Sequence, residues 1–113
     1  MKKRELKKKD LKIEVKLTWP GIKGSYKHLF QVDEESSISI VPKSELIKAG
    51  FKPEGTLLVK NDGGSFQHWE YCLAVFEIDG EMMHGRVVMG PENSTPVLGW
   101  WVLKDFRNQR RRV

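Results

Sequence analysis

Residues 30–42 have the sequence FQVDEESSISIVP, the segment most informative about the fold of this chain. It begins at the end of an apolar strand, crosses an acidic and hydroxyl-rich loop, and resumes as an apolar extended run that stops at Pro42. Aromatic and β-branched residues on both sides of the loop favour strands. The sequence therefore predicts a strand over residues 28–32 and a second over residues 38–41. Asp33 opens the polar loop between them.

Outward from this stretch, the chain keeps the period of two that is typical of half-buried strands. Before it, Leu11, Ile13, Val15 and Leu17 alternate with polar residues. After it, residues 56–60 and 66–78 flank the turn sequence NDGGS, and Asp79-Gly80 precedes a strand at 82–89. Asx and Gly residues accept the positive φ that hairpin turns need. We expect a long protruding hairpin with its tip around Asp62, Gly63 and Gly64.

Helical segments are few and short. Residues 43–49 read as one or two helical turns closed by Gly50, and residues 100–106 have an apolar helical face. A chain of 113 residues has room for one domain. The sequence thus predicts a mainly β fold, a small closed or sandwiched sheet with one or two short helices, over residues 11–113. Closure limits exposed strand edges in a chain of this size.

The net charge of +5 is unevenly placed. Residues 1–12 carry seven Lys or Arg against two acids, and residues 104–113 carry five against one, so the middle of the chain is net acidic. Residues 1–10 are predicted to be a basic N-terminal arm. Such arms are commonly solvated, and they can also grip phosphate without reading sequence.

Other features of the composition narrow the class of protein. No apolar run approaches the roughly 20 residues that span a membrane, and no apolar stretch follows the basic start as in a secretory signal. The single cysteine, Cys72, lies in an apolar strand-like run and has no intrachain partner for a disulfide. We expect a cytoplasmic protein without a membrane segment, in which Cys72 is a buried small hydrophobe.

With these elements in place, the sequence resembles the retropepsin-like aspartic peptidases. The order of elements in residues 30–42 is similar to that of the family's active-site segment, where an apolar strand leads into Asp-Thr/Ser-Gly. Asn61-Asp62-Gly63-Gly64 falls where the family has its flap hairpin, and residues 90–99 resemble its second hallmark, an apolar pair followed by Gly. The resemblance covers residues 11–113.

The resemblance implies a small closed β-barrel of the acid-protease type. It also implies that Asp33 is the catalytic residue and that Asp62, Gly63 and Gly64 cover a peptide or protein substrate. Two aspartates share a proton in this mechanism. The ionised carboxylate takes a proton from the attacking water, and the protonated carboxyl supports the carbonyl oxygen of the peptide. Because one chain supplies only one such aspartate, the resemblance implies a homodimer, with no cofactor and no metal.

One position departs from the family pattern. Glu34 and Glu35 stand where the family has a hydroxyl residue and a Gly. The hydroxyl braces the two active-site loops of a dimer, and the Gly admits backbone and substrate close to the aspartate. Added carboxylates near Asp33 also repel one another across a dimer axis. The sequence therefore predicts impaired catalysis.

Two other interpretations of the chain stay open. Asp33, Glu34 and Glu35 lack the spaced ligands and Gly of a calcium loop, which disfavours a metal site. A non-catalytic β domain that binds nucleic acid or a protein partner through its basic termini is the alternative function. A steep fall of affinity with salt would favour it, whereas cleavage that requires Asp33 would favour the peptidase.

Overall fold

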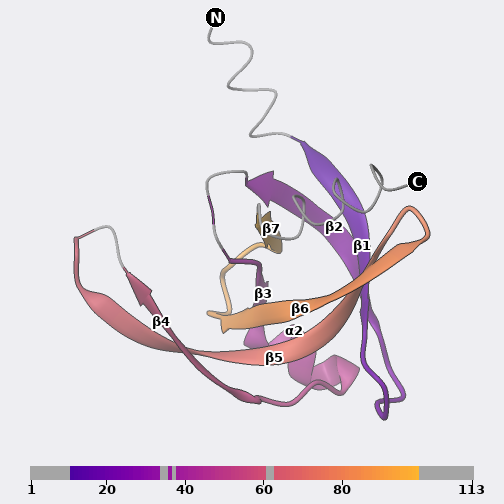
Figure 1. The fold of residues 1–113 in the computed structure, drawn as a ribbon, viewed down its shortest axis with the longest axis horizontal. Helices are drawn as coiled ribbons and strands as arrows, with labels where there is room; N and C mark the ends of the chain where they lie inside the picture. The colour runs from indigo at the N-terminus through magenta and orange to yellow at the C-terminus, as the bar shows by residue number, and fades with distance from the viewer. Residues whose placement is uncertain (1–10, 34–35, 37, 61–62, 100–113) are drawn as a thin grey trace, which may run out of the picture.

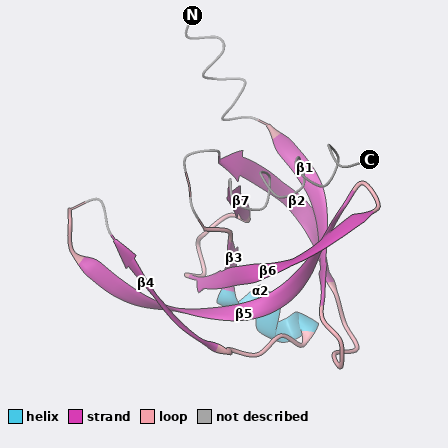
Figure 2. Cartoon of the chain, viewed as in Figure 1, coloured by secondary structure: helices cyan, strands magenta, loops and turns pink. Residues whose placement is uncertain are grey.

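The computed structural model describes residues 11–33, 36, 38–60 and 63–99, and within these ranges the chain forms seven strands and one helix (Figures 1 and 2). The elements in chain order are β1 (Lys12–Thr18), β2 (Tyr26–Asp33), β3 (Ile40–Pro42), α2 (Lys43–Ala49), β4 (Gly55–Lys60), β5 (Phe66–Ile78), β6 (Glu81–Gly90) and β7 (Val97–Gly99).

Six strands close a barrel. Their order is β1, β2, β7, β3, β6 and β5, and the ring closes because β5 also pairs with β1. The pairs β2–β7 and β3–β6 are parallel, and the other pairs are antiparallel. β4 pairs with the first half of β5, and the resulting hairpin projects away from the barrel (Figure 1). The closed mainly β barrel predicted from the sequence is confirmed.

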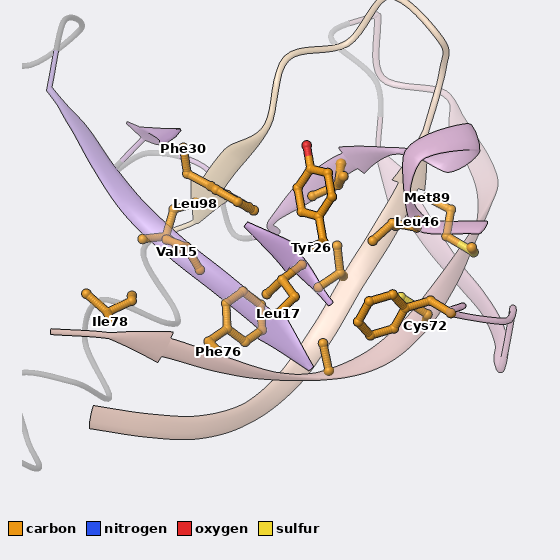
Figure 3. Packing of buried hydrophobic residues seen from close by; sticks show 14 of the residues in the cluster. Val15, Leu17, Tyr26, Phe30, Leu46, Cys72, Phe76, Ile78, Met89 and Leu98 are labelled. Carbon is orange, nitrogen blue, oxygen red and sulfur yellow. The ribbon is translucent and has the colours of Figure 1, made fainter. Parts of the chain in front are cut away.

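The core lies inside this ring and comes from alternate strand positions. Val15 and Leu17 on β1 are fully buried, as their spacing predicts. On β5, every second residue from Cys72 to Ile78 points inward. Figure 3 shows side chains from these strands gathered with Phe30 and Leu98. A continuous apolar interior thus joins the two ends of the chain's described part.

The helix α2 and the turn after β5 follow local sequence. Gly50 ends α2 with a φ of 106°, and its N–H donates to the carbonyl oxygen of Ile47 at 3.0 Å. Asp79 and Gly80 have φ angles of 52° and 81°, the positive pair that a tight hairpin requires. The predicted helix at residues 43–49 and the predicted turn are confirmed.

Several element boundaries differ from expectation by one or two residues, and β2, for example, begins at Tyr26 instead of residue 28. Two of the differences lie on either side of the loop after Asp33. β2 extends through Asp33, which was expected to open the loop, because Asp33 pairs with Gly99 of β7. β3 begins at Ile40 instead of residue 38, since Ser39 is engaged in bonds to two other strands. The predicted arm over 1–10 and the predicted helix over 100–106 lie outside the described residues. Within the described ranges there is no helix long and apolar enough to cross a membrane.

Candidate active site

Asp33 is the last residue of β2, at the rim of the barrel, and its side chain is exposed. The strand beneath it is held by parallel pairing with β7, in which Val32 lies opposite Leu98 and Asp33 lies opposite Gly99. Val32 and Leu98 are buried. The backbone of Asp33 is thus held by the strand pairing above the buried core, and its carboxylate lies on the exposed side.

The loop after Asp33 is held by short-range hydrogen bonds. The N–H of Ser36 donates to the carbonyl oxygen of Asp33 at 3.2 Å. The hydroxyl of Ser36 donates to the carbonyl oxygen of Ile38 at 2.8 Å and accepts from the N–H of the same residue at 3.3 Å. These bonds connect Ser36 to Asp33 on one side and to Ile38 on the other.

Ser39 ties the end of this loop to two strands. Its hydroxyl accepts a hydrogen bond from the N–H of Gly99 at 2.9 Å, and its carbonyl oxygen accepts one from the N–H of Val88 at 2.8 Å. Ser39 is buried, so a hydroxyl there serves the backbone of β7 and not the solvent. Sequence reasoning missed this role, and an isolated Ser between two apolar residues is the only signal that marks it.

Gly99 leaves no room for a side chain where β7 passes the residues that follow Asp33. A Cβ at this position would lie 2.5 Å from the carbonyl oxygen of Ile38 and 3.0 Å from that of Ser36. Contacts this short with backbone atoms cannot be relieved by a side-chain rotation. The apolar pair followed by Gly, which the sequence singled out at residues 97–99, is therefore placed against the residues that follow Asp33.

A pocket of about 460 Å³ lies between the projecting hairpin and the barrel. The hairpin contributes Val59, Lys60, Gly63 and Trp69, and the barrel side contributes Ile38, Ile40, Val88 and Pro91. Its walls are mostly apolar, which suits the side chain of an extended peptide. Asp33 is not among the lining residues, so this pocket adjoins the aspartate's loop through Ile38.

Of the predicted site residues that the structure describes, Gly63 alone lines this pocket, and Asp33 lies outside it. Gly63 lines the pocket, and Gly64 has the positive φ of 89° expected at a hairpin tip. Asp62 lies outside the described residues, as do Glu34 and Glu35. Sequence reasoning missed Trp69, which the alternation of β5 could have found, since it lies on the face opposite to Cys72 and the other core positions.

The remaining chemistry-bearing groups lie away from this pocket. Burial raises the pKa of the Cys72 thiol to about 12, which keeps the sulfur protonated and unreactive at neutral pH. Among the residues that the structure describes, no group of three or more His, Cys, Asp or Glu side chains is arranged to hold a metal ion.

Comparison with known proteins identifies this architecture. The sequence matches no family model and no curated protein. Among solved structures, the EIAV protease complexed with the inhibitor HBY-793 superposes with a TM-score of 0.66 at 11% identity, over 86% of this chain and 88% of that one. This chain has the retropepsin-like fold.

Two foamy viral structures agree with this assignment of the fold. The simian foamy virus (mac) protease, determined in solution, has a TM-score of 0.55 at 20% identity over 83% of this chain and 97% of that chain. A foamy viral protease-reverse transcriptase in complex with an RNA/DNA hybrid has a TM-score of 0.54 at 16% identity, over 79% of this chain and 11% of the larger one. The fold expected from the resemblance in sequence is therefore confirmed.

Proposed function

We propose that this chain is a retropepsin-like aspartic peptidase homologue that acts as a homodimer and has impaired activity at neutral pH. The observation that carries the proposal is the position of Asp33. It ends β2, is exposed at the barrel rim, and is paired with Gly99 beside a loop that reaches the apolar pocket.

Peptide hydrolysis without a covalent intermediate needs two carboxyl groups in different protonation states. One carboxylate takes a proton from the attacking water, while the protonated carboxyl donates a hydrogen bond to the carbonyl oxygen of the scissile bond. One chain contributes one aspartate at the end of β2. Two copies related by a two-fold axis supply the second, with Asp33 of each chain close to its symmetry mate.

The substrate in this proposal is an extended peptide segment of an unfolded or flexible protein. The β4–β5 hairpin covers it, and residues Asp62, Gly63 and Gly64 at the tip approach its backbone. An apolar side chain of the peptide fits the pocket formed by Ile40, Val88 and Trp69 with their neighbours.

Glu34 and Glu35 set the expected limit on catalysis. Glu34 lacks the hydroxyl that braces the loops, and Glu35 adds a side chain where Gly leaves space. At neutral pH the carboxylates of both chains repel one another, so residual activity is expected in acid. Activity should rise below neutrality and fall again once both aspartates are protonated.

The test is a set of three variants assayed on an unfolded protein substrate. The double change Glu34→Thr with Glu35→Gly rebuilds the family triplet around Asp33 and should increase cleavage. Adding Asp33→Asn to the rebuilt chain should abolish the increase. A rebuilt chain that forms a dimer by sedimentation and still cleaves nothing would overturn the proposed chemistry.

The same measurements address the alternative function. A chain that stays monomeric at high micromolar concentration at pH 5 and pH 7 would have no shared aspartate pair. Binding of nucleic acid that weakens steeply with salt would then favour a domain acting through its basic termini.

A cytoplasmic location belongs to the proposal as well, and the buried, protonated thiol of Cys72 is consistent with a reducing compartment.

A further inference from the structure

The first turn of α2 makes side-chain contacts with three distant parts of the chain. Lys43 Nζ lies 2.6 Å from Glu70 Oε1 on β5, and the Ser44 hydroxyl donates to Glu92 Oε1 at 2.8 Å in the loop after β6. The next residue, Glu45, accepts a hydrogen bond at 2.5 Å from the hydroxyl of Tyr26 on β2. We refer to Lys43, Ser44 and Glu45 as the α2 clasp.

Two of these contacts are made by residues that adjoin the pocket lining in the chain. Glu70 follows Trp69, and Glu92 follows Pro91, and both Trp69 and Pro91 line the pocket. Successive side chains of a strand point to opposite faces, so Glu70 faces α2 when Trp69 faces the pocket. The clasp therefore holds the hairpin on the face of β5 opposite to Trp69, and it holds the loop after β6 at the residue next to Pro91.

The third contact connects the clasp to the barrel core. Tyr26 is buried, and its ring meets that of Phe30 edge to face with centroids 6.1 Å apart. Burial, followed by the hydrogen bond and the charge of Glu45, raises the pKa of the Tyr26 phenol, so it remains a neutral donor. Tyr26 is the first residue of β2, and Asp33 is the last. The clasp is therefore connected to the strand that carries the aspartate.

The three contacts differ in strength because they differ in exposure. The side chains of Lys43 and Glu70 are 46% and 42% exposed, and ion pairs of this kind are weak and screened by salt. The Tyr26–Glu45 bond is short and partly buried. The contact of the helix with β2 is therefore less open to screening by salt than its contact with the hairpin.

We propose that Lys43 and Ser44 are positioning residues that set the separation between the β4–β5 hairpin and the pocket floor. The inference rests on the proposed function in one respect, that the pocket receives the peptide. Release of Lys43 from Glu70 lets the hairpin move away from the barrel, and reformation of the pair returns Trp69 to the pocket. Loss of the Ser44 hydroxyl removes the hydrogen bond to Glu92 and loosens the loop next to Pro91.

The first test needs no catalysis. Amide hydrogen exchange is measured on the full chain without substrate, at low salt, for the hairpin amides of residues 56–60 and 66–71. Lys43→Met should accelerate this exchange about threefold, the size expected for loss of an exposed ion pair, while amides of β1 and β6 keep their rates. The matched control is Lys48→Met, which removes an exposed lysine from the last turn of the same helix.

Two further measurements separate the clasp from general destabilisation. The charge swap Lys43→Glu with Glu70→Lys should return hairpin exchange to the rate of the unmodified chain. In 1 M salt, the unmodified chain and Lys43→Met should exchange at the same rate, because screening removes the pair. Equal acceleration in Lys48→Met, or acceleration spread over the barrel amides, would overturn the proposal.

The second test uses the rebuilt peptidase, Glu34→Thr with Glu35→Gly. Adding Ser44→Ala or Lys43→Met should raise KM about threefold with kcat unchanged, since the clasp acts on peptide binding and not on the reacting atoms. The outcomes are distinguishable. If the rebuilt chain never cleaves but hairpin exchange responds as expected, the clasp proposal holds and the peptidase proposal is overturned. If the rebuilt chain cleaves but neither variant changes hairpin exchange or KM, the peptidase proposal holds and the clasp proposal is overturned.

Discussion

The two halves of β5 perform different tasks although they belong to one continuous strand. From Cys72 to Ile78, every second side chain is buried in the barrel, and the strand pairs with β6 along this half and with β1 at residues 75–77. From Phe66 to Tyr71 the strand pairs with β4, and none of its side chains is buried. Phe66 is 61% exposed, whereas Phe76 is fully buried.

This difference shows how one strand joins a stable scaffold to an element that covers a pocket. Burial of alternate apolar residues stabilises the barrel half, and local openings are rare where such contacts are dense. The hairpin half has little buried apolar area and relies on β4 and on the ion pair between Lys43 and Glu70. Trp69 reaches the pocket from this weakly held half.

The largest expected effect separates the two halves by stability. Phe76→Ala should lower the free energy of unfolding by about 3–5 kcal/mol, because it removes a buried aromatic ring and leaves a cavity. Phe66→Ala, the matched change in the hairpin half, should alter it by about 0.5 kcal/mol or less. Urea denaturation followed by tryptophan fluorescence measures both. Similar losses in the two variants would contradict the division of β5.

An intermediate effect is expected at the crossing of β7 and the Asp33 loop. Gly99→Ala should lower the free energy of unfolding by about 1–3 kcal/mol, since the new methyl group meets the carbonyl oxygens of Ile38 and Ser36. Gly63→Ala is the control in the hairpin, where the new methyl group would meet no described atom within 4 Å. Thermal and urea unfolding measure the effect. A neutral Gly99→Ala would mean that the loop after Asp33 moves away without cost.

The smallest effect is the dependence of stability on pH through Cys72. This residue lies at the boundary of the two halves and is the first of the alternating buried residues of β5. Burial raises the thiol pKa from 9.0 to about 12, so folding favours the protonated form. The corresponding stability is complete below the unfolded pKa and is lost as pH rises from about 9 through about 12. Tyr26, whose pKa is also raised, acts in the same direction.

Two measurements check this pH dependence. Urea midpoints between about pH 8 and pH 11 should decrease with pH, and Cys72→Ala should reduce the decrease. At about pH 8, a thiol reagent should modify the unfolded chain quickly and the folded chain slowly. Rapid modification of the folded chain would show that the barrel half opens as easily as the hairpin.

Much of the fold could be predicted from the sequence because its causes are local. The alternation around Val15 and Leu17, the positive φ at Gly80 and the helix end at Gly50 each depend on a few neighbouring residues. The resemblance to retropepsins added the order of elements, and the fold agrees with it. The extension of β2 through Asp33 was not predicted, because it depends on pairing with Gly99, far away along the chain.

The candidate site was predicted less completely. Asp33, Gly63 and Gly64 were named from motifs, and of these three Gly63 alone lines the pocket. The pocket walls include Trp69 and Val88, which look like ordinary strand residues in the sequence. Ser39 and Gly99 are 60 residues apart in the chain and meet only after the barrel closes. No sequence pattern, such as a hydrophobic period or a turn motif, predicts a hydrogen bond between residues so far apart in the chain.

Local sequence was enough to predict most strand positions, the tight turns, the short helix and the choice of Asp33 as the candidate residue, since these follow from side-chain period, backbone preference and a motif within a few residues. The tertiary structure was needed to show that β5 closes the ring against β1, that Gly99 packs on residues after Asp33, and that α2 contacts Glu70 and Glu92, the chain neighbours of two residues that line the pocket. These arrangements depend on which surfaces become buried together when the whole barrel forms, a condition that no short stretch of the chain contains.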